Sequence, residues 1–95
     1  MAIKDVTDQN IKDFCGISDD SSDALFVGFK AAAYGIIKAY TGLSDDEING
    51  YDDLATAYLV LINDMYNQRD YTTSNDKLNP LVVTILSLHS GNLVG

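Results

Sequence analysis

Two long stretches of the chain carry apolar residues around most of a helical circumference, and this pattern constrains the fold more than any other feature. In residues 23–40, two apolar stripes follow the three- and four-residue spacing of a helix and lie side by side. Residues 52–69 show a similarly wide apolar arc. Because arcs this wide must be buried, we expect the two helices to form a central antiparallel pair. The apolar residues are Leu25, Phe29, Ala32, Ile36 and Tyr40 in the first stripe, Phe26, Ala33 and Ile37 in the second, and Leu54, Tyr58, Leu61, Ile62, Met65 and Tyr66 in the later stretch.

Two shorter helices are expected toward the ends of the chain. Thr7 can cap the first of them, and Gly16 can end it in the left-handed conformation. Asn79 and Pro80 are residue types favoured at the N-cap and the first position of a helix, so they predict the start of the last one. That helix should run from residue 81 to about residue 89.

The remaining segments are predicted to be turns and connections. Ser44 and Glu47 have the spacing of a capping box, which starts at most a short turn before Asn49 and Gly50 break it. Residues 90–95 contain two glycines and are expected to form a flexible C-terminal tail. No strand pattern, internal repeat or low-complexity tract is present. We therefore predict an all-α fold, a single small four-helix domain over residues 1–95.

The chain is acidic, with a formal net charge of -8 and only six scattered lysine and arginine residues. Neither the total charge nor a local basic patch favours binding to nucleic acid or to an anionic membrane. No stretch has the length of a membrane span, and the first ten residues lack the apolar segment of a signal peptide. With one cysteine, no intramolecular disulfide can form. We expect a soluble protein that is made in the cytoplasm and binds no membrane.

Catalytic groups are scarce in this sequence. Cys15 is the only cysteine and His89 the only histidine, and they lie in different predicted helices near opposite ends of the chain. We interpret Cys15 as a buried structural thiol, next to Phe14 on an apolar face. We expect His89, in the last helical turn, to bond free carbonyl groups there. The sequence therefore predicts no enzyme, no catalytic residue and no cofactor, and an enzyme subunit that uses Cys15 is a weaker alternative.

The acidic clusters do not make a convincing metal site. Residues 45–50 resemble the first half of a calcium-binding loop, but Thr56 stands where the bidentate glutamate is required. The loop that begins at Asp19 fails in the same way, with Lys30 at that position. We interpret these carboxylates as solvated loop residues and as favourable charges at helix N-termini. No metal is expected.

The apolar surface of the two long helices exceeds what a domain of this size can cover, which indicates that part of it meets another subunit. One side of the first long helix is nearly smooth, because Gly28 and Gly35 lie seven residues apart and point the same way. Since glycine weakens a helix, close approach by another backbone is the expected compensation. The candidate residues for an interface with another subunit or a partner are Gly28, Gly35, Ala39, Leu88, Leu93 and Val94.

Three segments, taken in order, resemble the gp6-like head-tail connector, or adaptor, family of tailed bacteriophages. They are residues 25–43 (LFVGFKAAAYGIIKAYTGL), 53–69 (DLATAYLVLINDMYNQR) and 78–90 (LNPLVVTILSLHS). The matching features are an Ala- and Ile-rich helix that ends in Tyr-Thr-Gly, an Asp-Leu helix start and a Leu-Asn segment after a variable loop. The chain departs from the family pattern at Gly28, Gly35 and Pro80.

The resemblance implies a structural role in the virion, at the interface between head and tail, after assembly in the host cytoplasm. It implies a closed homo-oligomeric ring of about twelve copies beneath the phage portal protein. Such a ring would extend the channel through which DNA passes without specific binding. It would also dock the downstream head-completion or tail-connector protein. The C-terminal part of the chain would reach toward the portal.

An alternative interpretation is a small acidic phage regulator, such as a DNA mimic that blocks a nucleic-acid enzyme. Its support is the net charge and the aspartate pairs at residues 19–20, 45–46 and 52–53. A mimic needs a spaced row of carboxylates on one face, whereas these pairs fall at loops and helix starts, where capping already explains them.

Overall fold

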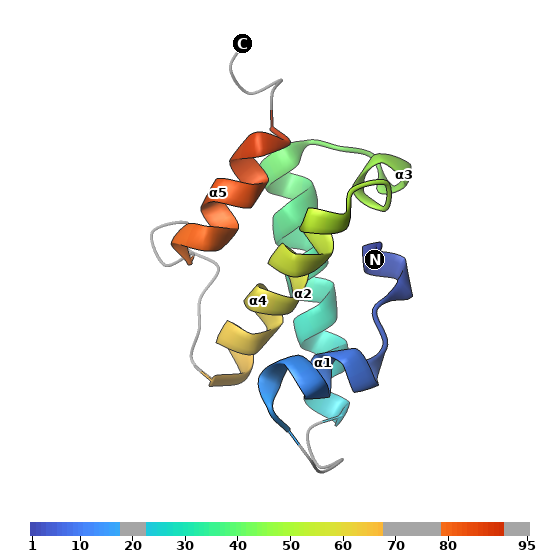
Figure 1. Ribbon diagram of the computed structural model, residues 1–95, viewed down its shortest axis with the longest axis vertical. Coiled ribbons are helices and arrows are strands. Elements are labelled where there is room, and N and C mark those ends of the chain that lie inside the picture. Colours follow the sequence, from blue (N-terminus) through green and yellow to red (C-terminus); the bar gives the residue numbers. More distant parts are fainter. Residues whose placement is uncertain (18–22, 68–78, 91–95) are drawn as a thin grey trace.

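The computed structural model describes residues 1–17, 23–67 and 79–90, and all of its regular structure is helical (Figure 1). This confirms the predicted all-α class. In chain order the elements are the 3-10 helix η1 (Ile3–Asp5) and the α-helices α1 (Asp8–Cys15), α2 (Asp23–Thr41), α3 (Asp45–Ile48), α4 (Asp52–Asn67) and α5 (Pro80–Leu88).

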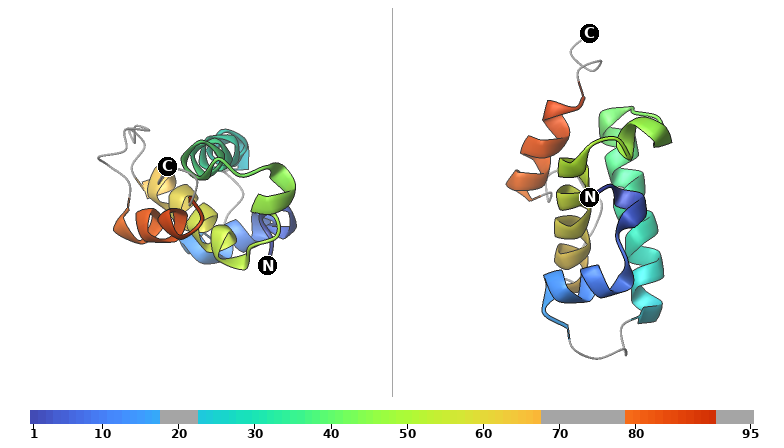
Figure 2. Two further views of the ribbon diagram at one scale, coloured as in Figure 1. Left: turned by 90° about the horizontal axis from the view of Figure 1, so that it is seen from above. Right: turned by 45° about the vertical axis from the view of Figure 1, so that its right-hand side comes forward.

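The two long helices α2 and α4 run antiparallel at the centre of the molecule, as predicted (Figure 1). Seen from above, α4 lies between α2 on one side and α1 on the other, with α5 beside it (Figure 2). η1 also packs against α4. Helix α4 is therefore the inner helix of the domain, and α2 lies at its back.

The helix boundaries follow local capping chemistry. Thr7 Oγ1 accepts a hydrogen bond from the Asn10 backbone N–H at 3.1 Å, and the Asn10 side chain accepts one from Thr7 N–H at 2.9 Å. Gly16 ends α1 in the left-handed conformation, with φ of 74°, and Gly42 follows α2 with φ of 72°. At α5, the Asn79 side chain accepts from Leu81 N–H at 2.8 Å and Pro80 is the first helical residue. The roles of Thr7, Gly16, Asn79 and Pro80 confirm predictions.

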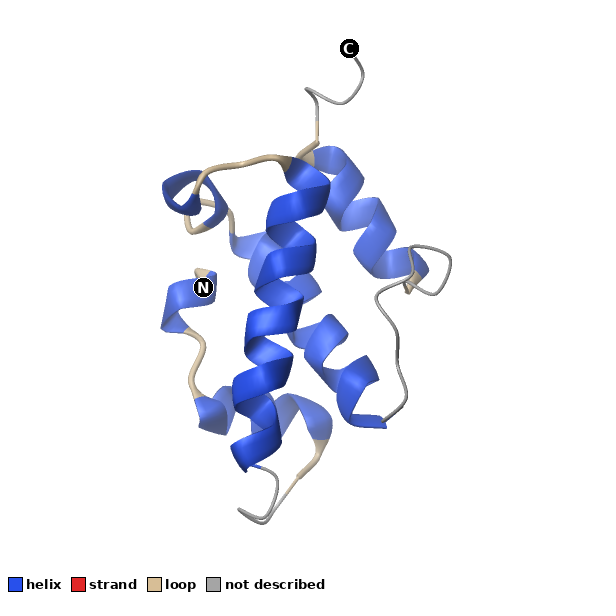
Figure 3. Ribbon diagram, turned by 180° about the vertical axis from the view of Figure 1, so that it is seen from behind, coloured by secondary structure: helices blue, strands red, loops and turns tan. Residues whose placement is uncertain are grey.

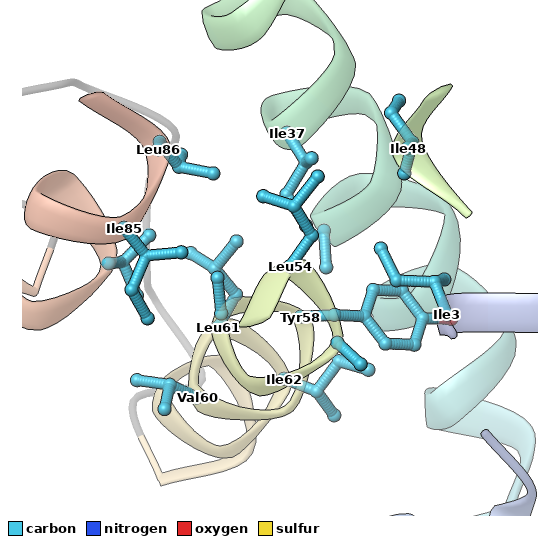
Figure 4. Close-up of a cluster of buried hydrophobic side chains, with 14 of the residues drawn as sticks. Ile3, Ile37, Ile48, Leu54, Tyr58, Val60, Leu61, Ile62, Ile85 and Leu86 are labelled. Carbon is cyan, nitrogen blue, oxygen red and sulfur yellow. The ribbon is translucent and has the colours of Figure 1, made fainter. Parts of the chain in front are cut away.

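The core is built around α4, because this helix buries residues on nearly every side. Figure 4 shows Leu54 and Leu61 of α4 among side chains from α2, α3 and α5. The buried residues of α4 are Leu54, Ala55, Ala57, Tyr58, Val60, Leu61, Ile62 and Met65.

The N-terminal segment also belongs to the core, which the sequence analysis did not predict. Ile3 of η1 is buried and lies beside Tyr58 (Figure 4). The Lys4 backbone N–H donates to Asn49 Oδ1 at 2.9 Å, which ties η1 to the end of α3. By contrast Phe14, predicted to share an apolar face with Cys15, is 45% exposed.

Helix α2 completely buries the described residues of only one of its two apolar stripes. Phe26, Ala33 and Ile37 are completely buried, whereas Phe29 and Ile36 of the other stripe are half-buried. Of the two long helices, α2 is therefore the one that leaves apolar surface uncovered.

Candidate interaction surfaces

Cys15 and His89 do not form a catalytic pair. Cys15 is the last residue of α1, and α1 and the C-terminal end of α5 lie at opposite ends of the molecule (Figure 1). The thiol is half-buried, less than predicted, and packs against the core. Burial raises the pKa of Cys15, which makes its reactive thiolate scarcer at neutral pH.

His89 has a different role from the one predicted. Its ring does not bond the carbonyl groups at the end of α5. Instead, Nε2 lies 2.8 and 2.9 Å from the two carboxylate oxygens of Asp53, at the start of α4. The ring also packs against Tyr51, with 4.2 Å between ring centroids. The side chain of His89 is only 15% exposed, so this contact joins the last residues of α5 to the first turn of α4.

The acidic cluster at α3 is occupied by contacts within the subunit. Asp45 accepts hydrogen bonds from the Tyr34 hydroxyl at 2.5 Å and from Lys38 Nζ at 3.0 Å. These two bonds hold the pKa of Asp45 below its usual value. Burial and the bond to Asp45 together raise the pKa of Tyr34 to about 12. Glu47 accepts from the Ser44 backbone N–H in the predicted capping box, so it serves as a helix cap and not as a calcium ligand.

Other carboxylates also lie against positive groups of the same subunit. Lys30 Nζ lies 2.8 Å from Asp8, and the N-terminal ammonium lies 3.2 Å from Asp52. In the part of the chain that the structure describes, no three carboxylate, thiol or imidazole groups are placed to hold a metal ion. The carboxylates of Asp8, Asp45 and Asp52 thus lie against positive groups of their own subunit.

The outer face of α2 consists of small and apolar residues that no other described element covers. Figure 3 shows α2 along the back of the molecule with no other described element in front of it. Val27 is 68% exposed, and apart from the adjoining residues and backbone of α2 itself, nothing lies within 4 Å of a Cβ built on Gly28 or Gly35. The expected close approach is therefore absent within the described part of the subunit. We call this surface the α2 outer face; its residues are Val27, Gly28, Ala31, Gly35 and Ala39.

A second apolar surface lies on α5. Leu81 and Leu88 are 51% and 72% exposed, and they lie on one side of the helix because they are seven residues apart. Thr84, between them, is also exposed. We call these three residues the α5 outer face.

Leu93 and Val94, the other predicted interface residues, lie outside the described residues. Ser90, where the tail was predicted to begin, is buried, and its hydroxyl donates to the Ser87 carbonyl at 3.2 Å.

Both outer faces lack acidic residues, although the chain as a whole carries a charge of -8. After Asp23, the charged residues of α2 are Lys30 and Lys38, and each is paired with a carboxylate from another segment. Helix α5 contains no acidic or basic residue. None of the described helices is long and apolar enough to cross a membrane.

A comparison with protein families identifies the family to which the chain belongs. The family model described as phage gp6-like head-tail connector protein matches residues 7–86. The chain belongs to this family. The connector matches from the N-cap of α1 to the last turns of α5, so the match includes Gly28, Gly35 and Ala39 and ends before Leu88. Neither the curated proteins nor the solved structures gave a match.

Family membership gives the connector a structural role at the head-tail junction of a phage virion, in assembly with portal or tail components. It is not an enzyme family. The half-buried Cys15 and the Asp53-bound His89 both make contacts within the subunit.

Proposed function

We propose that copies of this chain form a closed ring beneath the portal, extend the DNA channel of the head and dock the next connector or tail component. Family membership carries this proposal. The structure supports it through the two apolar faces that stay open in the subunit, because a single copy that worked alone would expose them to water. Contact between copies removes that exposure.

The acidic charge suits a conduit for DNA. A net charge of -8 on every copy repels phosphate, so a ring of such subunits disfavours lasting contact with the DNA that passes through it.

The C-terminal segment is proposed to hold the ring on the portal. Leu93 and Val94, which lie outside the described residues, would insert between portal subunits beyond the end of α5 at Leu88. One such segment binds weakly, because ordering costs about 1 kcal/mol or more per residue, but many on one ring bind together through avidity. Deletion of residues 92–95 should leave the domain folded and abolish retention on portal-bearing heads. Wild-type occupancy of the truncated chain would mean that helical surfaces do the docking.

Native mass spectrometry tests the proposed function. The purified chain is measured alone and after mixing with the portal ring of the same phage. The proposal predicts a complex of one portal ring with a full ring of connector copies, even if the free chain is monomeric. A stable dimer that does not bind the portal, and that competes with DNA for a nucleic-acid enzyme, would contradict the proposal and support the DNA-mimic interpretation.

A further inference from the structure

We propose that the ring closes through one specific contact, in which the α5 outer face of each copy packs against the α2 outer face of the next copy. The inference rests on the proposed function, since it names the surfaces through which the proposed ring assembles. It concerns Leu81 and Leu88 on one side and Gly28 and Gly35 on the other.

Charge restricts where two copies can meet. Each subunit carries a charge of -8, so contact between surfaces that bear exposed carboxylates is unfavourable. Asp13 on α1, Asp46 on α3 and Asp52 on α4 are such exposed groups. The α2 and α5 outer faces carry no acidic side chain, and the two lysines of α2 already have carboxylate partners in their own subunit. These two faces can therefore approach without burying like charges.

The shapes of the two faces are complementary. Leu81 and Leu88 are seven residues apart, which corresponds to about 10.5 Å along a helix. Gly28 and Gly35 have the same separation, and the space above each is open. Leucine side chains from one helix can fill the two depressions that the glycines leave in the other, so the backbones come close. This contact supplies the close approach that the glycines of α2 lack within the subunit.

The positions of the two faces favour a ring over a simple dimer. Helix α2 lies along the back of the molecule (Figure 3), whereas α5 lies toward the front beside α4 (Figure 1). A contact between two different surfaces is heterologous, so every copy still presents one unused face of each kind. Such a contact repeats from copy to copy until the ring closes.

Two substitutions that introduce opposite charges on the two faces test the contact. Gly35→Glu and Leu88→Lys each place an unpaired charge in the proposed interface and should lower the assembled fraction on portal rings at least tenfold. Both changes in one chain bring opposite charges together across the interface and should restore assembly. If the helices cross in the opposite direction, Gly28→Glu rescues Leu88→Lys instead. Gly35→Leu, which fills the depression without adding charge, should also block assembly.

Controls separate this inference from the proposed function. All the changed positions are exposed in the subunit, so the free variants should keep a cooperative thermal transition like that of the wild type. Thr56→Glu, at an exposed position of α4 that belongs to neither face, should assemble normally. If the wild-type chain forms rings but the single variants do so equally well, or if neither pair is rescued, the proposed contact is wrong and the connector function stands. If the wild-type chain itself does not join the portal, the proposed function fails.

Discussion

At the scale of single residues, Gly35 is a helical glycine for which the described part of the subunit offers no compensating contact. It lies in the middle of α2 with open space around its Cα, so nothing in the subunit requires glycine there. Gly35→Ala should therefore stabilise the free subunit by about 0.5–1 kcal/mol, because alanine loses less backbone entropy in a helix. Urea denaturation measures the change.

Gly16→Ala is the matched control, since Gly16 also has open space but a φ of 74°. It should destabilise the subunit by about 1 kcal/mol, because residues with a Cβ rarely adopt that conformation. A destabilising Gly35→Ala change would show that a contact within the subunit requires the glycine.

The hydrogen bond between Tyr34 and Asp45 makes the stability of the subunit depend on pH. The pKa of Tyr34 is raised to about 12 from an ordinary value of 10.0, so its neutral hydroxyl is favoured in the folded state. The stability gained from this bond is fully present below pH 10 and is lost as the pH rises through the folded value. For Asp45 the pKa is lowered, so its contribution is present above the ordinary carboxyl pKa and is lost as the pH falls through the lowered value.

Tyr34→Phe should lower the free energy of unfolding at pH 7 through loss of this charge-assisted hydrogen bond, by a small amount because the bond is exposed to solvent. The difference from the wild type should shrink between pH 10 and pH 12. Denaturation at pH 7, 10 and 12 provides the measurement, and a difference that stays constant up to pH 12 would contradict the assignment. Tyr40→Phe is the control, because the hydroxyl of Tyr40 faces Ser87 and no carboxylate.

Residue-level predictions succeeded where the determining interactions are local. Thr7, Ser44 and Asn79 cap helices through bonds to residues two or three positions away, so their roles can be read from spacing. The contact between His89 and Asp53 joins residues 36 positions apart, and helical periodicity does not specify such a contact. The burial of Ile3 was missed for the same reason, since it depends on Tyr58 of α4.

At the scale of the elements, His89 and Asp53 hold the end of α5 against the start of α4. Replacing either residue by alanine should destabilise the subunit, and the two changes should be coupled by about 1 kcal/mol in a double-mutant cycle. Asp52, which is 85% exposed and lies against the N-terminal ammonium, provides the control. A cycle between Asp52→Ala and His89→Ala should show no coupling. If Asp53 and His89 also show none, the contact does not hold the two helices together.

The sequence predicted which elements form but not how they share the core. The apolar arcs of residues 23–40 and 52–69 are similarly wide, and both were expected to be central. In the structure α1, α2 and α5 cover α4, and α2 keeps one side open. Which side stays open depends on where the short helices dock, and the pattern of one helix does not contain that information.

At the scale of the whole molecule, the candidate site is a pair of surfaces and not a pocket. Gly28, Gly35, Ala39 and Leu88 were singled out from the sequence as interface residues, and the structure places all four at exposed positions. Leu81 and Val27 were missed as surface residues, because an apolar residue in a helix is by default assigned to the core. Their exposure is visible only once the neighbouring helices are in place.

A head-tail connector is a fixed part of the virion between head and tail. Electron cryomicroscopy of purified virions tests this most directly, because the helical domain is large enough to be recognised in a reconstruction of the junction. The predicted result is a closed ring of this fold directly beneath the portal, coaxial with the DNA channel. Intact virions whose junction contains no copy of this chain would contradict the account.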